Sequence, residues 1–131
     1  MKNLFVPYEI AKQLKEKGFD EPCICVYKKG VKKTVYPVLS NEPSYPFKTV
    51  KNTQTGSLHF SSPLYQQVID WFEEKHNIII LLHFVMGVNT FEFWIKTSDD
   101  KIIFDLYHEL ENKDKYIVLR TAFEKALKLI P

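Results

Sequence analysis

The residue types that could do chemistry occur in small groups, and the first is a carboxylate–imidazole pair. Glu73 and His76 stand at i and i+3 of a predicted helix, which is half of a carboxylate-bridged di-metal pattern. A di-metal centre needs a second such pair and two further acids on facing helices, and the sequence holds no second copy. His76 also falls at the end of the helix, where exposed carbonyls favour a cation. We therefore predict that this pair binds no metal.

Two further groups contain a nucleophile. Ser57 and His59 stand two residues apart, but no predicted strand precedes them and the Gly-x-Ser-x-Gly elbow of hydrolases is missing. Cys23 and Cys25 are separated by one residue, which suits neither an unstrained disulfide nor a four-ligand zinc site. Free thiols on a strand are usually buried and inert. The sequence thus predicts no catalytic residue, metal or cofactor, and we expect the chain not to be an enzyme.

A basic cluster is one candidate binding site. It surrounds Gly30 at the tip of a predicted hairpin and consists of Lys28, Lys29, Lys32 and Lys33, flanked by Tyr27 and Tyr36. Such a tip could contact phosphates while the rings stack on bases, or it could protect the strand edges from pairing. Residues 1–60 hold ten Lys against five acids (+5), and residues 61–131 hold eight basic and eleven acidic side chains (−3), which gives a net charge of +2. This low net charge favours the protective role, and nucleic-acid binding stays the alternative function.

An aromatic row is the other candidate binding site. In the stretch Thr90–Lys96 the period-two alternation turns Phe91, Phe93 and Ile95 towards the core and the intervening side chains away from it. The same alternation over residues 101–107 turns Asp105 and Tyr107 outward. The predicted ligand- or partner-binding residues are Trp94, Tyr107, His83, Glu92 and Asp105, with Tyr27 and Tyr36 extending the row if the first hairpin joins the same sheet.

The same face has a second interpretation. Residues 40–60 lack periodicity, yet this segment contains Tyr45, Phe47 and Phe60, which a plain solvated linker would not usually carry. The segment could pack over Trp94 and its neighbours as a second small core, since an uncovered face of this kind would be an exposed apolar patch. The sequence leaves both interpretations open.

The elements that must position these residues follow from caps, turns and periodicity. The predicted helices run from Pro7 to Gly18, from an N-cap at Ser62 to Asn77, and from Asp114 to Ile130, and the predicted strands cover residues 23–27, 34–36, 78–82, 90–96 and 101–107. The strand that starts at Ile78 is apolar enough to lack a solvent face. The order α-β-β-loop-α-β-β-β-α predicts an α+β fold with one antiparallel sheet of about five strands and helices on one face. We expect residues 1–131 to form a single domain with a long irregular loop at 40–60.

Length and composition constrain the location. The longest apolar segment, residues 78–88, is about half of the ~20 residues that a membrane-spanning helix needs. The apolar run Leu4–Val6 is too short for the core of a signal peptide. Together with the unbridged cysteines, these features predict a cytoplasmic protein without a membrane segment.

Three segments resemble a known group of proteins. They are PLYQQVIDWFEEKHNI at residues 63–78, FVPYEIA and KEKGFD at residues 5–11 and 15–20, and FEKALKLI at residues 123–130. Together they resemble small uncharacterised proteins encoded by bacteriophages and integrated elements of gut bacteria. The resemblance implies an accessory protein in the host cytoplasm that acts by binding a host protein or a small-molecule ligand, and it supplies no catalytic residue to carry over.

Overall fold

The structure is a computed structural model that describes residues 4–28, 38–39, 49–55, 59–97, 99, 102–105 and 114–131. The chain divides into two compact units, Met1–Val68 (unit 1) and Ile69–Pro131 (unit 2), and the boundary falls within helix α2 (Tyr65–His76). The expectation of a single domain stays a prediction.

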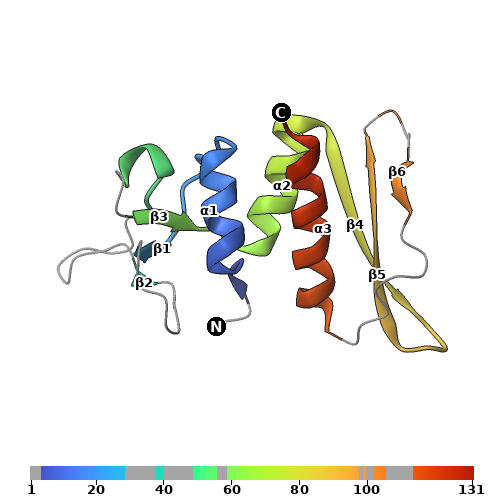
Figure 1. Cartoon of the computed structure of the whole chain (residues 1–131). Coiled ribbons are helices and arrows are strands. Elements are labelled where there is room, and N and C mark those ends of the chain that lie inside the picture. Colours follow the sequence, from blue (N-terminus) through green and yellow to red (C-terminus); the bar gives the residue numbers. More distant parts are fainter. Residues whose placement is uncertain are drawn as a thin grey trace. The chain divides into compact units, whose positions relative to one another are not determined.

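Unit 1 contains helix α1 and a small antiparallel sheet (Figure 1). Its elements are α1 (Tyr8–Glu16), β1 (Cys25–Lys28), β2 (Val38–Leu39), the short 3-10 helix η2 (Asn52–Gln54) and β3 (His59–Ser62). The strand order is β2-β1-β3, and α1 packs against β3. Pro7 precedes α1 with an extended backbone, and Gly18 follows it at φ 89°, so both predicted helix ends are confirmed.

The long segment at 40–60 is more ordered than the sequence predicts, in the part that the structure describes. Val50 pairs with Cys23 through two backbone hydrogen bonds of 2.7 and 2.9 Å, and η2 follows directly. The segment then ends in β3, which pairs with β1 along its whole length. The predicted returning strand at 34–36 lies outside the described residues. Besides β3, β1 pairs with β2, which begins at Val38, after Pro37.

Helix α2 begins later than predicted. Ser62 is the last residue of β3 rather than an N-cap, and the helix starts at Tyr65. The Gln67 side chain accepts a hydrogen bond from the Leu64 N–H at 2.9 Å, which satisfies one of the backbone donors that a helix start leaves unpaired. Asn77 ends the helix in the left-handed region at φ 54°, as its position predicts.

Unit 2 contains a second antiparallel sheet and helix α3 (Figure 1). Its strands are β4 (Ile78–Val85), β5 (Thr90–Thr97) and β6 (Ile102–Asp105), in the order β4-β5-β6, and α3 (Lys115–Leu129) packs against β4 and β5. The α+β class is therefore confirmed. The single sheet of about five strands is wrong, because β1 pairs with β2 and β3 and the described strands form two separate sheets.

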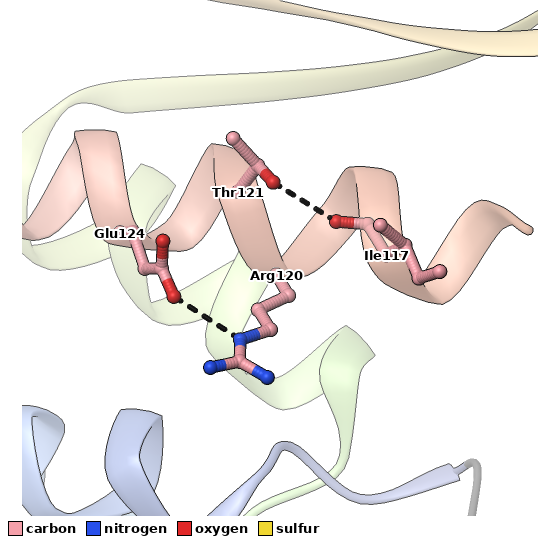
Figure 2. Close-up of polar contacts among 4 residues, drawn as sticks. All are labelled: Ile117, Arg120, Thr121 and Glu124. Atoms are coloured by element: carbon pink, nitrogen blue, oxygen red, sulfur yellow. Dashed lines mark hydrogen bonds and ion pairs between the residues drawn. The ribbon is translucent and has the colours of Figure 1, made fainter. Parts of the chain in front are cut away.

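Helix α3 has a capped start and a polar outer side. The Asp114 side chain accepts a hydrogen bond from the Tyr116 N–H at 2.9 Å, which is a standard N-cap contact. Figure 2 shows the outer side, where the Arg120 Nε donates to the Glu124 Oε1 at 3.1 Å and the Thr121 hydroxyl donates to the Ile117 carbonyl at 3.1 Å. None of the helices in the described part of the chain is both long and apolar enough to cross a membrane.

The sheet of unit 2 has two unlike faces. The first face contains the buried apolar side chains Ile78, Ile80, Phe93 and Ile95, as the alternation in β5 predicts. Helix α3 buries its own apolar side, and we assign the first face as the side that it covers. The expectation that β4 lacks a solvent face is wrong, since Leu81 on the second face is exposed and so is Phe84 near the turn.

Candidate functional site

The register of β4 and β5 brings several of the predicted binding residues together. His83 stands opposite Glu92, and Leu81 stands opposite Trp94. Opposite residues of an antiparallel pair lie on the same side of the sheet, and so do residues two apart on one strand. These four residues, with Thr90 two positions before Glu92, are called the second face below.

Glu92 is the most unusual residue of the second face. The sequence predicts a side chain that points away from the first face, on a side that is either open or covered, and the residue is 8% exposed. Its Oε2 atom has no hydrogen-bond partner within the described part of the chain. The His83 Nε2 lies 3.7 Å from this atom, which is too long for a hydrogen bond. Burying a carboxylate oxygen without a hydrogen bond costs free energy, so this position is not explained by stability.

Three other side chains of the second face, those of His83, Trp94 and Thr90, share this strand pair with Glu92. The His83 side chain is 44% exposed, and its ring meets the Trp94 ring edge-on at a centroid distance of 5.3 Å. Thr90 is buried, and its hydroxyl oxygen likewise has no hydrogen-bond partner among the described residues. The second face thus combines a buried acid, a buried hydroxyl, an exposed imidazole and an indole.

The two strands contribute differently to the second face. Thr90 and Glu92 on β5 are buried, whereas Leu81 and His83 on β4 are exposed. A fully covered second core would bury the β4 side chains as well, and a fully open platform would expose those of β5. The observed face fits neither interpretation completely, because its side chains on β4 are accessible whereas the polar side chains Thr90 and Glu92 on β5 are buried.

Comparison with family models, curated proteins and solved structures finds no match for this chain. The resemblance to phage-encoded proteins therefore stays a prediction. The site has to be argued from its own geometry.

The remaining predicted binding residues do not all join the second face. The register places Asp105 of β6 opposite Trp94, and Tyr107 and Tyr36 lie outside the described residues. Tyr27 belongs to the other sheet, so its predicted place in the aromatic row is wrong. It is buried, its hydroxyl donates to the Val6 carbonyl at 2.8 Å, and its ring contacts Tyr8 and Phe60.

The basic cluster lies almost wholly outside the described residues. Lys28 is the last residue of β1, and Lys29, Lys32 and Lys33 fall in the stretch that is not described. The nucleic-acid alternative therefore stays a prediction.

The groups considered for catalysis and metal binding have local roles where the structure describes them. His76 ends α2 with its ring 4.5 Å from that of Trp71, and burial lowers the pKa of its imidazole. Cys23 and Cys25 are free and buried, and burial raises the pKa of the Cys23 thiol to about 12. Within the described residues, no three His, Cys, Asp or Glu side chains come together as a metal site.

Sequence reasoning missed two residues of the second face, the exposed Leu81 and the buried Thr90, and only Thr90 carries a polar side chain. The alternation that places Glu92 and Trp94 on one side places Thr90 there too, so the signal was present. Its burial was not visible in the sequence, because a Thr beside a turn is ordinarily solvated.

Proposed function

We propose that this chain is a binding protein without catalytic activity and that the second face of the unit 2 sheet holds a small ligand. The observation that supports the proposal is the buried Glu92 carboxylate, whose Oε2 has no hydrogen-bond partner among the described residues. Buried polar atoms in folded proteins are nearly always hydrogen-bonded. An unpaired one is costly to stability, and positions where local rules are broken in this way are commonly functional.

The surroundings of Glu92 support a ligand rather than a structural role. The His83 imidazole, which is 44% exposed, lies 3.7 Å from the Glu92 Oε2 on the β4 side, so a ligand that displaces this side chain would reach the carboxylate there. Trp94 supplies a large, flat surface next to it. Acid, imidazole and indole in one spot offer charge, hydrogen bonding and apolar contact, which is the usual make-up of a small-molecule site.

A thermal-shift screen tests this proposal. The purified chain is screened against a panel of small organic cations, anions and neutral compounds, and at least one class is expected to raise its melting temperature, because a ligand stabilises the state it binds. Extraction of the purified protein, followed by mass spectrometry, identifies any compound that co-purifies with it.

Two substitutions on β4 localise the binding. Leu81→Arg places a bulky charge on the second face, whereas Phe84→Arg changes a residue of similar exposure on the first face. The ligand response is expected to disappear in the first variant and persist in the second. A panel without any response, or an equal loss in both variants, would reject the second face as a binding site.

A further inference from the structure

We infer that the ligand of the second face carries a primary ammonium group, which donates hydrogen bonds to the Glu92 Oε2 and the Thr90 hydroxyl and lies against the Trp94 ring. This inference rests on the proposed function and specifies the chemistry of its ligand. It starts from two buried oxygens, at i and i+2 of β5, that have no hydrogen-bond partner among the described residues.

The first argument is the polarity of the unpaired atoms. An ionised carboxylate only accepts hydrogen bonds, and a hydroxyl can both accept and donate. A ligand group that satisfies both must therefore bring N–H or O–H donors, and beside a buried negative charge a positive donor is bound most strongly. An anion would be repelled by Glu92, and a neutral donor would leave the buried charge uncompensated.

The second argument decides which class of cation fits these two oxygens. A metal ion would need three or four ligands, and no group of three His, Cys, Asp or Glu side chains that could hold one is found among the described residues. A guanidinium group is a planar fork that matches both oxygens of a carboxylate, whereas the unpaired atoms here belong to two different side chains. A primary ammonium has three donors around one compact charge, so it can bond both oxygens at once.

The third argument is the neighbouring ring. Indole attracts a cation to its face more strongly than the other aromatic side chains. Trp94 follows Glu92 by two positions on β5, and its edge-on contact with His83 at 5.3 Å holds the ring beside the accessible side of the face. A ring so placed can contact the ammonium or the apolar group attached to it.

Titration of the full chain with small probes, followed by ¹H–¹⁵N NMR, tests the inference. The probes are n-butylammonium, tetramethylammonium, guanidinium, butyrate and 1-butanol. Butylammonium is expected to bind most tightly and to shift the Trp94 indole signal. Tetramethylammonium has the charge but no N–H donors, so equal binding of this probe would overturn the inference.

Two near-isosteric substitutions assign the contacts. Glu92→Gln removes the charge and is expected to weaken butylammonium binding about 10- to 100-fold, as expected for a charge-assisted hydrogen bond. Thr90→Val removes the hydroxyl and is expected to weaken it about 3- to 10-fold. Unchanged affinity in a Glu92→Gln variant whose NMR spectrum shows a folded chain would overturn the inference.

Helix α3 offers matched controls for both changes. Glu124→Gln and Thr121→Val make the same substitutions on the outer side of α3, where both side chains already have protein partners (Figure 2). Neither control is expected to change the affinity, and an equal effect there would overturn the inference. Binding of butyrate or 1-butanol at the second face would reject the ammonium and leave the proposed function standing. A complete lack of response to all probes, together with a negative thermal-shift screen, would reject both.

Discussion

In unit 1 the buried amide of Asn52 uses both of its polar atoms, donating to the Phe19 carbonyl at 2.7 Å and accepting from the Ser61 N–H at 2.8 Å. In unit 2 the buried carboxylate of Glu92 leaves Oε2 without a hydrogen bond to any described residue. Both side chains are polar and both are buried. The amide joins η2, the segment after α1 and β3 by hydrogen bonds, whereas the Glu92 Oε2 makes no hydrogen bond to a described residue and has the His83 imidazole at 3.7 Å.

The same contrast holds for other polar groups. In unit 1, Lys15 bonds Thr55 and the His59 carbonyl, and Asp20 accepts from the Thr53 backbone and hydroxyl. The buried Ser61 and Ser62 hydroxyls make no hydrogen bond of ordinary geometry within the described residues, although they interact with the side chains of Cys23 and Tyr27, respectively. They are neutral, however, so their unpaired state costs much less than that of a carboxylate. Polar burial in unit 1 builds the fold, whereas in unit 2 it leaves a carboxylate oxygen without a hydrogen bond to a described residue, which is the basis of the proposed ligand site.

The largest expected effect is on the rate at which the buried Cys23 thiol of unit 1 is chemically labelled. Because burial raises the pKa of the Cys23 thiol from 9.0 to about 12, the native protein at pH 8 should react with iodoacetamide about a thousand-fold more slowly at Cys23 than the unfolded chain. Mass spectrometry of labelled peptides, with and without denaturant, measures both rates. Fast native labelling would show that the sheet of unit 1 opens readily.

The core of unit 2 should respond next most strongly. Phe93→Ala removes a fully buried ring from the first face and is expected to lower the free energy of unfolding by about 3–5 kcal/mol. Phe84→Ala is the control, since this ring lies on the same face but is 47% exposed, and it should cost less than about 1 kcal/mol. Chemical denaturation measures both, and equal losses would contradict the assignment of the first face.

The contrast between the two units predicts that removing the Asn52 amide lowers the stability of unit 1. Asn52→Ala leaves the Phe19 carbonyl and the Ser61 N–H without partners and is expected to cost about 2–4 kcal/mol. Thr53→Ala next to it removes only the exposed hydrogen bond from the Thr53 hydroxyl to Asp20, keeps the one from the backbone N–H, and should cost less than about 1 kcal/mol. If the two variants have the same melting temperature, the Asn52 amide does not stabilise unit 1 in the way described.

The smallest expected effect is a gain in stability rather than a loss. Glu92→Gln replaces an incompletely paired buried charge with a neutral amide of the same shape and is expected to raise the free energy of unfolding of the ligand-free chain by about 1 kcal/mol at pH 8. Chemical denaturation, applied to Glu92→Gln and to Asn52→Ala as to the Phe93 variant, measures the change. A clear destabilisation would mean that Glu92 is a structural residue like Asn52, and the contrast between the units would vanish.

Local sequence rules predicted much of the fold. Pro7 and Gly18 mark the ends of α1, Asn77 ends α2, and the alternation in β5 correctly buries Phe93 and Ile95. These signals depend on backbone sterics and on a side-chain period, which are properties of a few neighbouring residues. The same period places Glu92 and Trp94 on one face, so the composition of the second face was predictable.

What the sequence alone determined about this protein is therefore its α+β class, the approximate helix ends and the sidedness of β5. Only the tertiary structure decided that the strands form two sheets, because pairing depends on which distant segments meet. The Tyr27 hydroxyl reaches Val6 within unit 1, and His59–Ser62 pairs with β1 instead of forming a loop and a helix cap. Only the tertiary structure decided, too, that Glu92 is buried. Its polarity is local, but its exposure depends on atoms far along the chain.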